Sequence, residues 1–228
     1  MKFVLCSVMA AGMCSAANAG LIEFNGQSYE TVDWNTSSMF SNVATGTVGG
    51  IGLTFETVDI SSTTIAENDF SNDSAFDALN FSGGDVESIA MRGGAAGQTT
   101  LTFDQAVGSV LILIGLPNDG SFANQFGAAI WDFEDGLAIS VIDSEGNPGL
   151  NLDAGNQLTN PSGTGSGPHQ SGVLGVLGSL SSLSWMQSTR QGYDNMQITF
   201  AVAPATVPTP AAGLVLLLPA AMAGRRRR

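Results

Sequence analysis

Hydrophobic and polar residues alternate along several short segments of this chain. In residues 98–103, Thr99, Leu101 and Phe103 share one side, and polar side chains occupy the other. A period of two residues is the pattern of a β-strand with one buried face. The same period occurs in residues 128–134, 137–141, 182–185 and 195–202, and more weakly in 21–24, 51–57 and 86–91. Residues 110–116 are apolar throughout, which predicts a central strand buried on both faces.

Turn residues separate these segments. Asp135-Gly136 stands between two alternating runs, and this dipeptide predicts a β-hairpin. The chain has 29 glycines in 228 residues, which is nearly double the usual glycine share of about 7%. Residues 149–172, rich in Gly, Ser and Pro, are expected to be irregular. We therefore predict an all-β fold for residues 20–206: a single antiparallel β-sandwich, jelly-roll-like, of nine or ten strands.

The N-terminal segment has the features of a secretory signal peptide. Lys2 provides a positive charge, residues 3–13 form a short apolar run, and Ala17-Asn18-Ala19 is an A-x-A cleavage site. The run is too short for a membrane-spanning helix of about 20 residues. We predict a signal peptide at residues 1–19, with cleavage after Ala19. Its partners would be the Sec-type export machinery and signal peptidase.

The C-terminal segment also has three parts. They are Val207, Pro208, Thr209 and Pro210; an apolar run at 211–224; and Arg225, Arg226, Arg227 and Arg228. The two prolines favour an extended chain. As a helix, residues 210–224 would span about 22 Å, and arginine side chains can reach from it toward the membrane surface. We predict a transmembrane helix whose arginines remain in the cytoplasm, with residues 20–206 outside.

This order of motif, apolar run and arginine cluster resembles the sorting signal of the PEP-CTERM family of exported bacterial proteins. It is most similar to the variant that begins Val-Pro-Leu-Pro-Ala, although Thr209 occupies the leucine position. The resemblance implies that residues 207–228 hold the protein in the inner membrane until an exosortase, a membrane protease-transpeptidase, processes it. The product would then reach the cell surface or the extracellular matrix. A plain C-terminal anchor is the alternative.

The body between these segments also resembles the β-sandwich ectodomains of that family. The similar parts are Thr100–Asp104 followed by 107–114, and residues 192–200. Such ectodomains often resemble carbohydrate-binding modules. We predict a structural or adhesive protein, with exopolysaccharide as a suggested partner. A carbohydrate-binding module of the same fold is the alternative, and a glycoside-active enzyme is the less favoured one.

Charge limits the partners of the body. The chain has a formal net charge of −13, and all 20 carboxylates lie in residues 20–206, with only Arg92 and Arg190 to offset them. Such a surface repels phosphate backbones, so we expect no nucleic-acid partner.

The residues needed for catalysis are scarce. Both cysteines, Cys6 and Cys14, lie in the predicted signal peptide, and His169 is the one histidine. We therefore expect no enzyme activity, no catalytic residues and no cofactor-binding or metal-binding residues. Calcium is the metal that we keep as a candidate, because it prefers carboxylate oxygens as ligands. The carboxylates considered for it lie in Glu67–Asp77, in Asp132–Gly136, and at Glu23 with Asp194, which would meet if the terminal strands pair.

Aromatic residues are the remaining candidates for binding, since they stack on sugar rings. Trp131 and Trp185 lie on the apolar sides of their predicted strands, so we expect them in the core. Tyr29 is a further aromatic candidate. Trp34 and Tyr193 are flanked by polar residues, and we predict them at the surface.

Overall fold

The computed structural model describes residues 20–35, 42–57, 60–68, 74–82, 86–91, 96–115, 130–145, 150–159, 171–187 and 196–204. These residues form one antiparallel sheet of fifteen strands and a single 3₁₀ turn at Ser74–Phe76, which confirms the all-β class. Among them there is no helix with the length and apolar character to cross a bilayer. The predicted signal peptide and C-terminal helix lie outside the described residues.

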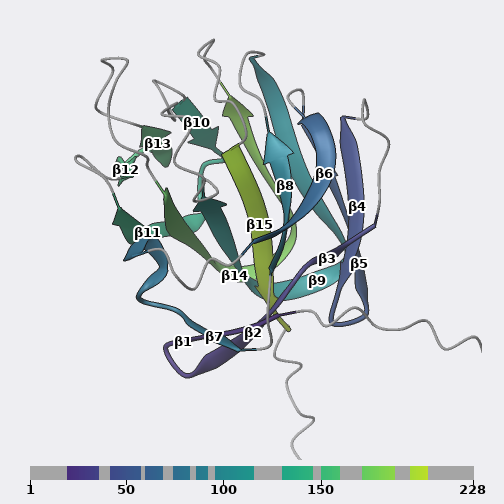
Figure 1. Cartoon of the computed structure of the whole chain (residues 1–228). Coiled ribbons are helices and arrows are strands. Elements are labelled where there is room, and N and C mark those ends of the chain that lie inside the picture. Colours follow the sequence, from purple (N-terminus) through teal and green to yellow (C-terminus); the bar gives the residue numbers. More distant parts are fainter. Residues whose placement is uncertain are drawn as a thin grey trace, which may run out of the picture.

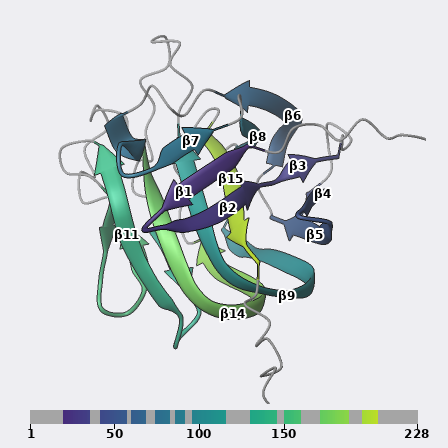
Figure 2. The ribbon, with the colours of Figure 1, turned by 90° about the horizontal axis from the view of Figure 1, so that it is seen from below.

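Two long strands form the centre of the sheet. β9 (Gly97–Gly115) and β14 (Ser171–Gln187) pair antiparallel along most of their length. Both strands curve midway, where the pairing register shifts on either side of Leu180 (Figure 2). Gly178, beside the shift, has a φ of 120°, a conformation that residues with a Cβ rarely adopt. The curve turns one sheet into two layers that face each other (Figure 1).

The first layer contains the beginning of β9 and the end of β14. Its strands come from both the N-terminal and the C-terminal half of the chain, and every neighbouring pair is antiparallel. Their order is β3 (Asp33–Trp34), β4 (Val43–Val48), β5 (Ile51–Glu56), β9, β14, β10 (Ile130–Phe133), β13 (Gln157–Thr159) and β12 (Asn151–Leu152).

The second layer contains the end of β9 and the beginning of β14. β11 (Ala138–Glu145) pairs with β14, and β15 (Met196–Ala203) pairs with β9. The outer edge of β15 is shared by β8 (Val86–Met91) and β2 (Gln27–Thr31). Beyond these lie β6 (Ile60–Asn68) on β8, and β1 (Leu21–Phe24) and then β7 (Asn80–Ser82) on β2.

Aromatic side chains fill the space between the two layers. Phe55 of the first layer and Phe200 of the second have ring centroids 5.3 Å apart. Trp131 and Trp185 stack at 5.2 Å, and Phe133 lies 5.4 Å from Trp185. All five are 2% exposed or less, so this cluster forms the main core.

A second apolar cluster lies on the other side of the second layer. There Leu111 and Leu113 of β9 pack with Ile22 and Tyr29 of the β1–β2 hairpin and with Phe76 of the 3₁₀ turn. The alternate β9 residues, Val110, Ile112 and Ile114, face the main core. The described part of the predicted strand, residues 110–115, is therefore buried on both faces, as its continuous apolar pattern indicated.

The predicted Asp135-Gly136 hairpin is wrong. β10 and β11 do not pair with each other; they follow one another along the same edge of β14, with Phe133 opposite Trp185 and Ala138 opposite Leu177. Gly136 does have the positive φ of a turn residue, 85°. It bends the chain around the curve of β14 instead of reversing its direction.

The prediction of an irregular segment at 149–172 is also wrong in its described parts. β12, β13 and the first residues of β14 lie there. The first half of β14 has no alternating pattern, because it is buried on both faces, with Val173 in one core and Leu174 in the other. The described sheet also has fifteen strands instead of nine or ten. Four of the additional strands, β3, β7, β12 and β13, have only two or three residues, which is too short for a pattern.

Candidate functional site

The two predicted targeting segments adjoin β1 and β15, two strands of the body that are separated by β2. Gly20 is buried, and its carbonyl accepts hydrogen bonds from the Thr31 amide at 2.9 Å and the Thr31 hydroxyl at 3.1 Å. Thr31 pairs in turn with Ala201, near the end of β15. The start and the end of the described sheet are therefore two strands apart. The predicted cleavage residues Ala17 and Ala19, the motif Val207–Pro210 and the cluster Arg225–Arg228 lie outside the described residues.

The core positions of Trp131 and Trp185 are confirmed, but the surface position predicted for Trp34 is wrong. Trp34 is 3% exposed, and its ring packs edge-on against Phe200 at 6.1 Å. Its backbone amide donates a 2.6 Å hydrogen bond to the Glu87 carboxylate, which fixes β3 against the body. The polar residues flanking Trp34 misled the sequence argument, because alternation directs them outward and the indole inward.

No aromatic ring is among the exposed large hydrophobic residues of the described body. Those residues are Leu21, Leu177 and Met186. Tyr29 is buried at 2%, with its hydroxyl accepting a hydrogen bond from the Ser109 hydroxyl at 3.2 Å. Tyr193 lies outside the described residues. Among the described aromatic residues, Phe24 and Phe81 are half-buried and none is fully exposed.

The candidate calcium ligands do not converge where they are described. No group of three His, Cys, Asp or Glu suited to a metal ion occurs in the described ranges. Asp132, Glu134 and Asp135 are all exposed, and Glu134 accepts a hydrogen bond from the Ser184 hydroxyl. Glu23 is exposed on β1, whose neighbours are β2 and β7, not β15. Asp194, His169 and most of the Glu67–Asp77 side chains lie outside the description.

An open groove of about 540 Å³ lies between β11 and the β12–β13 turn. Its described lining mixes aliphatic and polar side chains, with no aromatic residue among them. Asp153 stabilises its own turn, where one carboxylate oxygen accepts hydrogen bonds from the backbone amides of Gly155 and Gln157 at 2.8 and 2.9 Å. Asn156 donates to the Leu137 carbonyl at 3.2 Å. These polar groups bond to the nearby backbone. Among the described lining residues, no group of acidic or nucleophilic side chains converges on one point.

The outer face of the first layer presents rows of hydroxyl groups. Pairing aligns Thr45, Thr54, Thr102 and Ser182 across β4, β5, β9 and β14. Thr47 and Thr100 belong to the two adjacent rows. We call these six residues the hydroxyl face. All six are exposed or half-buried.

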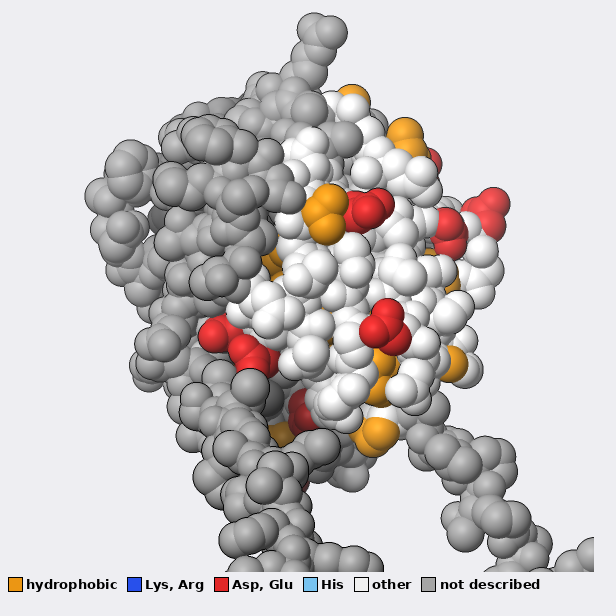
Figure 3. Space-filling view, turned by 90° about the vertical axis from the view of Figure 1, so that its right-hand side faces the viewer, with side chains coloured by type: hydrophobic (Ala, Val, Ile, Leu, Met, Phe, Trp, Pro, Cys, Tyr) orange, Lys and Arg blue, Asp and Glu red, His pale blue; other side chains and the backbone are white. Residues whose placement is uncertain are grey.

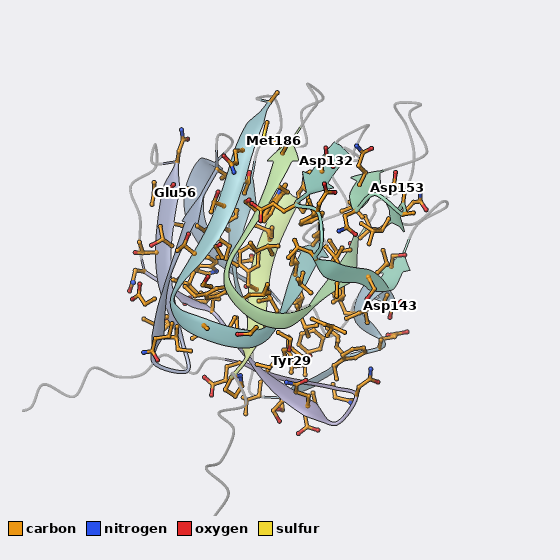
Figure 4. All side chains as sticks on the ribbon, turned by 180° about the vertical axis from the view of Figure 1, so that it is seen from behind. Tyr29, Glu56, Asp132, Asp143, Asp153 and Met186 are labelled. Carbon is orange, nitrogen blue, oxygen red and sulfur yellow. The ribbon has the colours of Figure 1, made fainter. Side chains whose placement is uncertain are left out.

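Acidic and apolar side chains border the hydroxyl face. Glu56 lies in the row of Thr100, and Met186 pairs with both Gln98 and Asp132 at its upper edge (Figure 4). Met186 is 50% exposed. The described residues include no lysine or arginine, and Figure 3 shows only scattered acidic and apolar side chains on the described surface of the β4–β5 side. The alternation at residues 98–103 places Thr100 and Thr102 on one face of their strand, but it does not align them with residues of other strands.

Comparison with known proteins gives no further guide. No protein-family model, no curated protein and no solved structure matches this chain.

Proposed function

We propose that this chain is an exported bacterial protein of the cell surface or extracellular matrix, sorted through a C-terminal signal of the exosortase type. Its body is a jelly-roll-like β-sandwich with a structural or adhesive role. The signal peptide at 1–19 directs export, and residues 207–228 hold the protein in the inner membrane until the exosortase acts. The partners are the export machinery, signal peptidase, exosortase and, in the matrix, exopolysaccharide.

The observation that carries this proposal is the relation between the body and the two targeting segments. The first strand of the described sheet begins at Leu21 and the last ends at Ala203. All of the described strand pairing lies between the two predicted targeting segments, as a protein processed at both ends requires.

The character of the described body supports a structural or adhesive role over catalysis. A hydrolytic site would need paired carboxylates in a cleft, whereas the groove contains Asp153 engaged in its own turn. Aromatic stacking on sugars, the usual basis of a carbohydrate-binding module, has no exposed ring in the described body to use. The acidic surface favours a protein that stays soluble outside the cell.

Variants of the tail test the sorting step. Each arginine costs about 2.5–3.5 kcal/mol at the bilayer centre on the insertion scale, so the cluster should hold the tail in the membrane. R225S/R226S/R227S/R228S should therefore release unprocessed protein. P208A/P210A should leave insertion intact but block processing, because the extended motif is lost. Membrane fractionation and mass spectrometry distinguish the two results.

The control is Pro204→Ala, which removes a proline just before the motif and should leave processing unchanged. Equal processing of P208A/P210A and the wild-type protein would contradict a role for the motif. The tail would then be a plain anchor.

A further inference from the structure

We propose that the hydroxyl face binds a neutral, hydroxyl-rich polysaccharide, and that this contact fixes the body in the matrix. The inference rests on the proposed matrix role and adds the surface and the class of polymer. Binding occurs through rows of hydrogen bonds between protein and sugar hydroxyls, without aromatic stacking.

The hydroxyl face forms a regular two-dimensional array. Strands in a sheet lie about 4.7–4.9 Å apart, and side chains on one face repeat every second residue, about 6.6–6.8 Å along a strand. Thr45, Thr54 and Thr102 lie side by side in one row, and Thr100 continues the array along β9. A long polymer can therefore contact many equivalent groups at once, which is how individually weak hydrogen bonds give useful affinity.

These hydroxyl groups are available and already ordered. None of the six makes a hydrogen bond with its side chain to another described residue, in contrast to Ser184, whose hydroxyl donates to Glu134. Five of the six are threonines, and a β-branched side chain has few χ1 conformations. Fixing such a side chain on binding costs less entropy than fixing a long flexible one.

Charge selects among polysaccharides. The face is bordered by the carboxylates of Glu56, Asp104 and Asp132, all of them exposed, and it contains no cation among the described residues. An anionic polymer would be repelled here. A neutral polymer has hydroxyl groups that can donate strong hydrogen bonds to the carboxylate oxygens. Met186, half exposed at the border, adds an apolar contact for the C–H surface of a sugar ring.

The test compares two polysaccharide fractions from the producing bacterium, neutral and acidic, separated by anion exchange and immobilised. The purified protein is passed over both. The triple variant T45V/T54V/T102V removes three of the four hydroxyls of one row but keeps the β-branched shape. We expect the wild-type protein to bind the neutral fraction with little salt dependence. The variant should bind at least about tenfold more weakly, since three hydrogen bonds are lost together.

Two further variants give the matched controls. T45S/T54S/T102S keeps the hydroxyls and should retain binding. S28A/S140A/S179A removes three exposed hydroxyls elsewhere, including Ser140 in the groove beside β11, and should also retain it. Circular dichroism establishes that all variants fold.

Several outcomes would overturn the proposal. The first two are a T45V/T54V/T102V variant that binds as tightly as the wild-type protein, and an S28A/S140A/S179A variant that loses binding. The other two are a wild-type protein that prefers the acidic fraction, and a wild-type protein that binds neither fraction. Export and tail processing are measured separately, so a protein that is sorted correctly yet fails this test would leave the proposed function standing.

Discussion

The two faces of the first layer differ in almost every physical respect, although the same strands form both. Phe55, Leu101 and Leu183 align across three strands on the inner face and are completely buried. One residue away, Thr54, Thr102 and Ser182 align in the same way on the outer face. Alternation thus separates two tasks: the inner residues stabilise the fold, and the outer ones can change with little effect on stability.

The largest expected effect comes from the inner face. Trp185→Ala removes a ring that packs against Trp131, Phe133 and Phe55, and should lower the free energy of unfolding by about 3–5 kcal/mol. Its neighbour Met186 points to the outer face, so Met186→Ala should cost less than about 1 kcal/mol. Urea unfolding of the two variants measures the contrast. Similar losses in both would mean that the two faces are not distinct.

An intermediate effect is expected at a buried hydroxyl. The hydroxyls of Thr57 and Thr99 lie 2.9 Å apart on the inner face, both 3% exposed or less. Thr99→Val would leave the Thr57 hydroxyl without this partner, at a cost of about 1–3 kcal/mol. The double variant T57V/T99V should recover most of that loss, because neither unpaired group remains. A double variant less stable than Thr99→Val would contradict the pairing.

The smallest effect is expected on the outer face. Thr102 is exposed and bonds no other described side chain, so Thr102→Val should change the free energy of unfolding by no more than about 0.5 kcal/mol. Thr102→Val and Thr99→Val are thus the same substitution, three residues apart, on the outer and the inner face of one strand. A loss matching that of Thr99→Val would show that the outer hydroxyls are structural.

Local patterns predicted the individual strands better than their arrangement. The alternation at 98–103 and the apolar run at 110–116 identified both ends of β9, because the side chains of a strand determine which of its faces are buried. The same patterns could not show that one long strand joins them. That depends on the curve around Leu180 and Gly178, where β14 and β9 shift register together.

The candidate surface was beyond sequence analysis for a related reason. The row from Thr45 to Ser182 takes one residue from each of four strands, and only their register aligns these residues. Trp34 was misplaced because a two-residue strand gives no pattern of its own. The targeting segments are different: each is recognised by the order of its own residues, and each stays a prediction.

The central claim is that both ends of the chain are removed on the way to the surface. Intact-mass measurement of protein from the surface and culture fractions tests it directly, in a host with an active exosortase. We expect a mature form that begins at Gly20 and lacks Arg225–Arg228. Surface protein that begins at Met1 would contradict the signal peptide, and surface protein that keeps the four arginines would contradict the sorting signal.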